Sequence, residues 1–138
     1  AIERFWRSLF AGAAACAFSP PPEGLGLSDE ACRHIRAARA VTDAVDFFLS
    51  EPRPDLIQRI DDTEAYCFGN PAHGLAVIII GGGSADIETE SMDCDARLRR
   101  FDVDTGSWTD LREVSAGGVL RVVAPDARVQ PFVLVAED

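Results

Sequence analysis

The spacing of hydrophobic residues along this chain changes once, at a joint around residues 52–61. Before the joint, apolar residues recur every three or four positions, as they do on one face of a helix. After it they alternate along short runs separated by turn-forming residues, which is typical of half-buried strands. Because the two patterns do not interleave, the sequence predicts an α+β fold with helices first, and argues against an alternating parallel sheet.

Two helices are predicted before the joint. The first carries one broad apolar stripe, formed by Ile2, Phe5, Trp6, Leu9, Phe10 and Ala13, and its end, from Leu9 to Phe18, is apolar all round. Three prolines at 20–22 prevent it from continuing. The second begins after Ser28, a favourable N-cap, and is expected to run to about Ser50. Its predicted buried residues are Ile35, Ala38, Val41, Val45, Phe48 and Leu49.

About seven short strands are predicted after the joint, near residues 65–69, 75–80, 85–90, 96–103, 107–114, 119–124 and 132–136. Between them lie turn sequences such as the glycines at 81–83, read as a hairpin, and Asp104-Thr105-Gly106. The apolar positions change face within 96–103, which predicts a β-bulge near Arg99 and Arg100. We therefore expect a helical segment over 1–52, a linker over 53–64 and an antiparallel β-sandwich over 65–138.

Composition restricts the class of protein. Of the 138 residues, 47% are hydrophobic and 26% charged, as in globular domains, and the formal net charge is −10. That charge repels phosphate backbones, so nucleic acid is not an expected partner; Arg33, Arg36 and Arg39 recur at helical spacing and are interpreted as a solvated helix face. No apolar run is long enough to cross a membrane, and the compartment stays open.

Two motifs resemble a cofactor or calcium site, but each lacks a residue that such a site requires. An apolar run at 75–80 leads into Gly81-Gly82-Gly83, but Asp86 occupies the place of the third glycine of a dinucleotide-binding turn and a strand pattern follows it. Asp102, Asp104 and Glu113 match three positions of a calcium loop, yet Ser107 occupies the position that requires glycine. Neither a cofactor nor calcium is expected.

The four cysteines do not form a zinc motif either. Cys16, Cys32, Cys67 and Cys94 contain no C-x-x-C pair, and neither histidine has a ligand-like spacing from them. We expect no metal site, and the sequence leaves open whether any two cysteines form a disulfide.

Catalytic residues are not evident. The acidic pairs Asp61/Asp62 and Asp93/Asp95 lie in polar, turn-like segments that offer nothing apolar to raise one pKa for acid catalysis. No Ser/His/Asp or Cys/His arrangement is visible, so no catalytic residue is assigned to this chain.

Four aromatic residues on the predicted strands allow two interpretations. Tyr66, Phe68, Phe101 and Trp108 either belong to the core, which is the commoner case at alternating positions, or form a flat platform on which sugars stack. Trp108 and Tyr66 are the candidate ligand-binding residues, and Trp108, just after a hairpin turn, is the first to examine for exposure.

Several of these segments occur in an order that resembles a known family. Phe5-Trp6, the apolar run Leu9-Phe10-Ala11-Gly12-Ala13-Ala14, Gly24-Leu25-Gly26-Leu27-Ser28 and Ala38-Arg39 are similar to the last barrel segment of glycoside-hydrolase-like proteins related to apiosidases. Thr63-Glu64-Ala65-Tyr66, the glycine turn at 81–83 and the hairpin through Gly106 and Trp108 then resemble the C-terminal β-sandwich that is labelled a collagen-binding domain. The resemblance covers nearly the whole chain.

The resemblance implies that the chain is the noncatalytic C-terminal portion of a larger protein: closing helices of a TIM barrel followed by an accessory sandwich that packs on the barrel. The catalytic carboxylates of such barrels lie mostly upstream. In the family, arginine and histidine flank the phenylalanine matched here by Phe18, whereas this chain has Ala17, Ser19 and Pro20.

Two other functions stay open at this point. In the first, the sandwich is a stand-alone module that binds either a carbohydrate, such as a polysaccharide, or a matrix protein. In the second, the chain is a small protein-interaction domain. For the fragment interpretation we expect the aromatic ridge of the first helix (Phe5, Trp6, Leu9 and Phe10) to be exposed, where it would contact the missing barrel or a second copy of the chain.

Overall fold

The computed structural model describes residues 2–12, 28–61, 63–90, 92, 95–115 and 117–136. Over these residues the helices are α1 (Ile2–Phe10) and α2 (Asp29–Val45), with short 3₁₀ turns η1 (Phe47–Leu49) and η2 (Pro54–Leu56). The strands are β1 (Glu51–Pro52), β2 (Ile57–Asp61), β3 (Glu64–Asn70), β4 (Gly74–Ile80), β5 (Ser84–Glu88), β6 (Ala96–Asp102), β7 (Ser107–Val114), β8 (Val119–Val123) and β9 (Gln130–Ala136).

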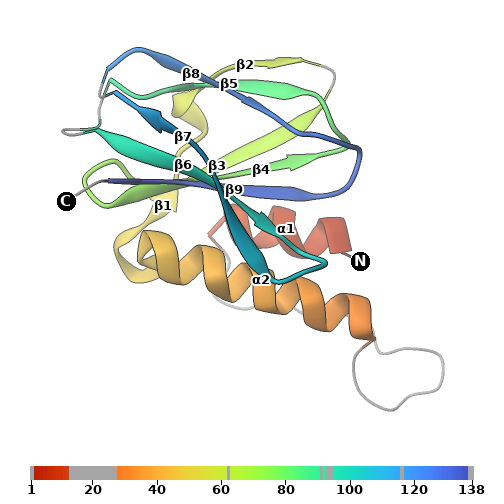
Figure 1. Cartoon of the computed structure of the whole chain (residues 1–138). Coiled ribbons are helices and arrows are strands. Elements are labelled where there is room, and N and C mark those ends of the chain that lie inside the picture. Colours follow the sequence, from red (N-terminus) through yellow and green to blue (C-terminus); the bar gives the residue numbers. More distant parts are fainter. Residues whose placement is uncertain are drawn as a thin grey trace.

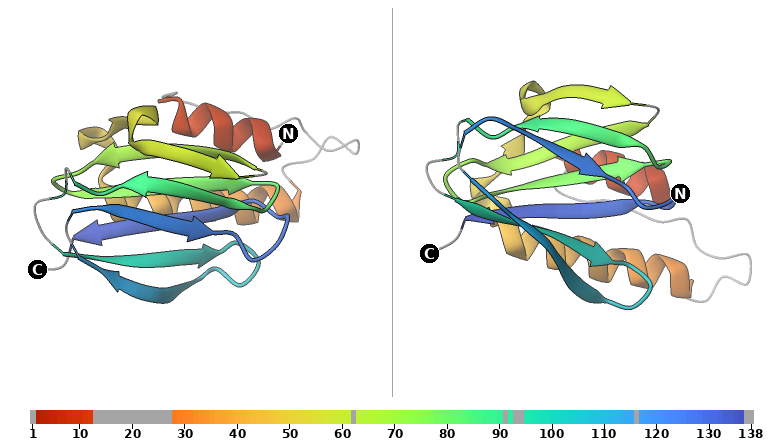
Figure 2. Two further views of the ribbon diagram at one scale, coloured as in Figure 1. Left: turned by 90° about the horizontal axis from the view of Figure 1, so that it is seen from above. Right: turned by 45° about the horizontal axis from the view of Figure 1, so that its top comes forward.

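The strands form two antiparallel sheets packed face to face. A six-stranded sheet has the order β1-β3-β4-β9-β6-β7, and a three-stranded sheet has the order β2-β5-β8. Both helices lie on the outer face of the six-stranded sheet, so the molecule has three layers: small sheet, large sheet and helices (Figures 1 and 2). The predicted α+β class, with helices followed by an antiparallel sandwich, is confirmed.

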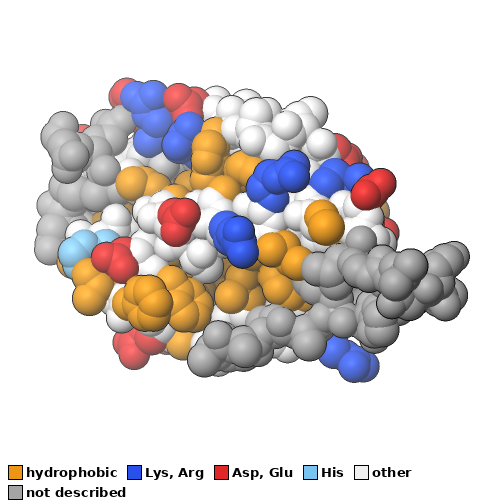
Figure 3. All heavy atoms as spheres, turned by 90° about the horizontal axis from the view of Figure 1, so that it is seen from below, with side chains coloured by type: hydrophobic (Ala, Val, Ile, Leu, Met, Phe, Trp, Pro, Cys, Tyr) orange, Lys and Arg blue, Asp and Glu red, His pale blue; other side chains and the backbone are white. Residues whose placement is uncertain are grey.

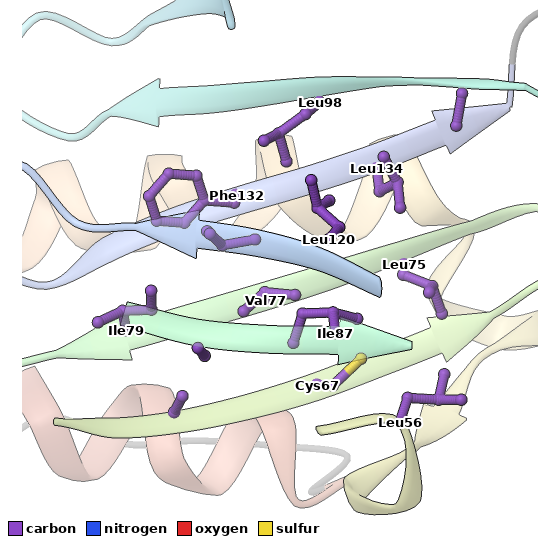
Figure 4. Packing of buried hydrophobic residues seen from close by; sticks show 14 of the residues in the cluster. Leu56, Cys67, Leu75, Val77, Ile79, Ile87, Leu98, Leu120, Phe132 and Leu134 are labelled. Atoms are coloured by element: carbon purple, nitrogen blue, oxygen red, sulfur yellow. The ribbon is translucent and has the colours of Figure 1, made fainter. Parts of the chain in front are cut away.

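Strand β4 is buried along its whole length because both of its faces are covered. Leu75, Val77 and Ile79 point into the space between the sheets, where they meet residues such as Ile87 and Leu120 (Figure 4). The alternate residues of the same strand point to the helices. A strand covered on both faces needs apolar residues at every position, which explains the unbroken run at 75–80.

The aromatic ridge of α1 is sealed by the chain itself, so the expectation of an exposed ridge is wrong. Trp6 is 0% exposed, Phe10 3% and Phe5 8%; only Leu9 is half-buried. The rings pack on the outer face of the large sheet, and Phe10 contacts Phe68 at 6.1 Å between ring centroids. Left uncovered, that face would expose apolar side chains of β4 and β9, and the helices bury it.

A buried polar contact joins the two helices. The indole Nε1 of Trp6 donates a hydrogen bond of 2.9 Å to Nδ1 of His34 on α2. His34 is buried, and its burial lowers its pKa below the ordinary 6.5. Since Nδ1 must carry a lone pair to accept this bond, the contact requires the neutral imidazole.

The second helix ends earlier than predicted. Its N-cap is Ser28, as expected, whose hydroxyl accepts from the Ala31 N–H. It stops at Val45 instead of Ser50, because Asp46 adopts a left-handed conformation with φ 57° and turns the chain away. Phe48 and Leu49 were expected to be buried, but they lie on η1 and are 94% and 52% exposed.

Two other connections differ from the prediction. The segment 53–64, expected to be a linker, contains η2 and β2, because Leu56 is anchored in the core between the sheets and β2 pairs with β5. The glycines at 81–83 do not close a hairpin. They carry the chain from β4 in the large sheet to β5 in the small one, with positive φ at all three positions.

The predicted β-bulge is confirmed by a register shift between Leu98 and Arg99, and the turn at Gly106 connects β6 and β7 as predicted. The predictions for Ala13–Phe18, for the prolines at 20–22 and for Cys16 and Cys94 lie outside the described residues.

The Trp6–His34 contact predicts a pH dependence of stability. The folded-state pKa of His34 is below its unfolded value, so the unfolded chain binds more protons and the contribution of His34 is lost as pH falls below about 6.5. The charged groups that act on it are Glu30, Arg33 and Asp104. Urea unfolding at pH values above and below this point should show the loss, and His34→Gln, which keeps an acceptor, should reduce it.

His73 provides the control, because it lies in the exposed turn between β3 and β4. His73→Gln should leave the pH dependence unchanged. An equal loss of stability on acidification in the His34→Gln variant would contradict the role given to His34.

Candidate functional site

The aromatic residues considered as a sugar-stacking platform do not lie together. All four are on the helix-bearing side of the large sheet, but Phe68 and Phe101 are buried. Tyr66 is on β3 and Trp108 on β7, four strand spacings apart in the sheet order, or roughly 19 Å. The structure therefore offers no continuous platform made of Tyr66 and Trp108.

Trp108 is half-buried and already has neighbours on its ring. The guanidinium carbon of Arg99 lies 4.8 Å from the ring centroid, a cation–π contact. Phe101 meets the same ring edge-on at 5.1 Å between centroids. Arg99 also donates a hydrogen bond of 2.7 Å to Asp110, which holds the guanidinium in place. A sugar that stacked on the Arg99 side of Trp108 would have to displace it.

Tyr66 is part of a polar contact between α1 and β3. Its hydroxyl donates to Oε2 of Glu64, and Nη2 of Arg7 donates to Oε1 of the same carboxylate at 2.8 Å. The hydrogen bonds from Arg7 and then Tyr66 lower the pKa of Glu64 to about 2, and the bond to Glu64 raises the pKa of Tyr66. The arrangement fixes helix α1 to the sheet.

A group of charged side chains lines a cleft at one end of the molecule, which we call the polar cleft. Its lining residues come from the amino-terminal ends of α1 and α2, the β6–β7 hairpin and the β8–β9 loop. Figure 1 draws these parts of the backbone at the same end of the molecule. Its volume is about 260 Å³. Its charged and polar lining residues are Glu3, Glu30, Arg33, His34, Arg100, Asp102, Asp104, Arg128 and Gln130.

An ion-pair network organises this cleft. Asp104, on the β6–β7 hairpin, pairs with Arg33 of α2 at 3.8 Å and with Arg128 of the β8–β9 loop. Arg128 also pairs with Asp126 at 2.8 Å, and its hydrogen bonds hold the pKa of that carboxyl well below its usual range. Three segments that are distant in sequence are thereby held around one space.

Sequence reasoning missed the polar cleft because its residues come from four separate segments. Two signals were available: Asp102 and Asp104, weighed as part of a calcium loop, and the arginine spacing at 33, 36 and 39, interpreted as a solvated helix face. That interpretation holds for Arg36 and Arg39, which are exposed, whereas Arg33 is half-buried and pairs with Asp104.

The acidic pairs show no catalytic arrangement over the described residues. Asp61 pairs with Arg59 at 3.0 Å on the edge strand of the small sheet. Asp95 is exposed, and Asp62 and Asp93 lie outside the described residues. In the polar cleft, Asp102 accepts from the backbone N–H groups of Asp104 and Thr105, as in an ordinary turn.

The described part of the chain shows neither a metal-binding cluster nor a membrane-spanning helix. No group of three or more histidine, cysteine or acidic side chains in the described part of the chain is arranged to hold a metal ion. Cys67 is buried in the core, and burial raises the pKa of its thiol to about 12, while Cys32 is exposed. Neither of the described helices has the length and apolar character needed to cross a membrane.

Comparison with solved structures finds a similar fold in parts of two glycoside hydrolases. The chain is similar over 98% of its length to part of a glycoside hydrolase family 5 protein from Bacteroides vulgatus ATCC 8482, with a TM-score of 0.76 and 14% sequence identity. It is also similar over 77% of its length to another glycoside hydrolase, with a TM-score of 0.64 and 12% identity. The chain covers only 35% and 25% of those two proteins.

The sequence comparisons give no family. A scan against family models finds no match, and a search of curated proteins finds no significant match. At 12–14% identity the structural similarity establishes the fold alone.

The surroundings of Trp108 predict the result of its removal. A fully buried aromatic residue costs about 3–5 kcal/mol when truncated to alanine, so the half-buried Trp108 should cost about 2 kcal/mol. Urea unfolding of Trp108→Ala measures this, and Trp108→Phe should recover most of the loss because it keeps a ring against Phe101.

A glycan array on the same variants separates the two roles of this residue. Loss of glycan binding in Trp108→Ala with unchanged stability would support the ligand-binding assignment instead.

Proposed function

We propose that this chain is the noncatalytic C-terminal portion of a glycoside-hydrolase-like protein, in which the β-sandwich and its two helices pack against a catalytic barrel and stabilise it. The observation that carries this proposal is the coverage. Nearly the whole chain, helices included, corresponds to 35% of one continuous hydrolase chain with a TM-score of 0.76.

Over the described residues the carboxyl groups form no catalytic arrangement, which fits this part of such a protein. Glycosidases use two carboxyl groups at a defined separation, one of them with a raised pKa. In the described part of the chain the carboxyl groups with a resolved shift, such as Glu64 and Asp126, have lowered pKa values because arginines bind them. Groups of that kind serve structure better than acid catalysis.

Because the aromatic ridge of α1 is buried within the chain, the proposed contact with the barrel must involve other residues. Phe48 and Leu49 are exposed and lie on η1, just before β1 in the chain. Phe10, Pro52, Pro54, Ile57 and Ile60 line an apolar groove of about 500 Å³. Figure 3 shows further hydrophobic side chains across the helix-bearing face, between charged ones. We propose that the barrel covers this side of the molecule.

The proposed subgroup of glycoside-hydrolase-like proteins is taken from the resemblance in sequence. The order of segments around Phe5-Trp6, Thr63-Glu64-Ala65-Tyr66 and Trp108 favours the group related to apiosidases, with the sandwich labelled a collagen-binding domain. We assign the chain no collagen-binding activity on that label, since Trp108 and Tyr66 are engaged by Arg99 and Glu64.

The size of the native gene product tests the proposal. An antibody raised against this chain should detect, in the cells that make it, a protein about three times the 14.9 kDa of the chain, since the chain covers 35% of its structural neighbour. The purified 138-residue chain, run on the same gel, gives the size reference.

Two results would contradict the proposal. One is a native protein that migrates with the purified chain, which would favour an independent binding or interaction domain. The other is hydrolysis of aryl glycosides by the purified chain, because the proposal assigns it no catalytic residue.

A further inference from the structure

The polar cleft has the dimensions of a site for one small ring. Ligand sites typically have volumes of ~300–1,000 Å³, and the cleft, at about 260 Å³, lies just below that range. Its wall combines charged groups with the apolar side chains of Ile2, Val103 and Val129. A wall of that kind contacts both the hydroxyls and the C–H faces of a small polar ring.

Arg100 distinguishes this cleft from a purely structural ion-pair network. It is half-buried on β6, and over the described residues its guanidinium makes no hydrogen bond or ion pair. The other half-buried arginines of the described chain all have partners, namely Arg7, Arg33, Arg53, Arg97 and Arg99. A partly desolvated guanidinium is costly without an acceptor, and its planar fork matches a carboxylate.

The neighbours of Arg100 limit the charge that the cleft accepts. Arg33 already pairs with Asp104, and Arg128 pairs with both Asp104 and Asp126. Glu30, Asp102 and Asp104 also line the cleft, and the whole chain has a net charge of −10. These carboxylates disfavour a phosphate or a densely charged polyanion there, whereas a single carboxylate can pair directly with the guanidinium of Arg100.

The remaining polar groups fit hydroxyls. The carboxylate oxygens of Glu30 and Asp102 accept hydrogen bonds, and the side chain of Gln130, 5% exposed, is held at the cleft by donating to Asp126 at 2.8 Å. One carboxylate together with several hydroxyls on a small ring is the chemistry of an acidic sugar.

We infer that the polar cleft binds a single uronic acid residue of a glycan, with the sugar carboxylate on the guanidinium of Arg100. This inference takes its choice of a sugar from the proposed function and adds a ligand class and a site to it. Because the site is small and half-open, we expect weak binding, with a dissociation constant on the order of 1 mM.

The test is an NMR titration of the ¹⁵N-labelled chain. The probes are the methyl glycosides of glucuronic and galacturonic acid, each compared with its neutral counterpart, methyl glucoside or methyl galactoside. At least one uronide should change the chemical shifts of backbone amides in the cleft, such as those of Arg100, Val103 and Gln130. It should also bind about tenfold or more tightly than the matching neutral sugar, because the neutral sugar cannot form the hydrogen bond between charged groups.

Arg100→Gln should weaken uronide binding by about tenfold or more and abolish the preference over the neutral sugar. Arg112→Gln is the matched control: it removes the same charge from the exposed face of β7, outside the cleft, and should leave binding unchanged.

Equal binding of charged and neutral sugars, shifts outside the cleft, or no binding of either uronide would overturn the inference. If Arg100→Gln does not fold, the shift map and the charge preference of the unsubstituted chain still decide. Because the size of the native protein is measured separately, a failure of the proposed function is distinguishable from a failure of this inference.

Discussion

The fold depends on burial of both faces of the six-stranded sheet. β4 lies in the interior of that sheet, and each of its residues is buried, alternately against the small sheet and against the helices. Removing either cover would expose a continuous apolar surface, at a cost of about 25 cal/mol per Å². The helices are therefore part of the core of this chain, and the aromatic residues of α1 face inward for the same reason.

This constraint also shapes the surfaces that remain for function. Once Phe5, Trp6 and Phe10 are used to cover the sheet, contacts with other proteins are left to η1, the apolar groove beside it and the outer sides of the helices. The opposite end of α2 is held by the Asp104 ion pairs, which also shape the polar cleft. Protein contact and ligand binding are thus proposed at separate places on the molecule.

Much of the fold could be predicted from local pattern, and most of the candidate site could not. Most of the longer strands follow from alternation or from an unbroken apolar run, the N-cap from Ser28, and the bulge from the change of face near Arg99. β2 was missed, because it lies in the segment expected to be a linker. The end of α2 was missed because Phe48 and Leu49 continue the helical spacing, while the left-handed Asp46 interrupts the backbone. The polar cleft joins Arg33, Arg100, Asp104 and Arg128 only through tertiary packing, which spacing along the chain does not encode.

Hydrogen exchange measured by NMR tests the sealed sheet most directly. The Trp6 indole N–H, bonded to His34 beneath the helices, and the backbone amides of β4 belong to the same buried unit in this account. Both should exchange only through global unfolding, with the free energy obtained from urea denaturation. Rapid exchange of the Trp6 indole while β4 stays protected would show that the helices detach from the sheet, and would contradict the account.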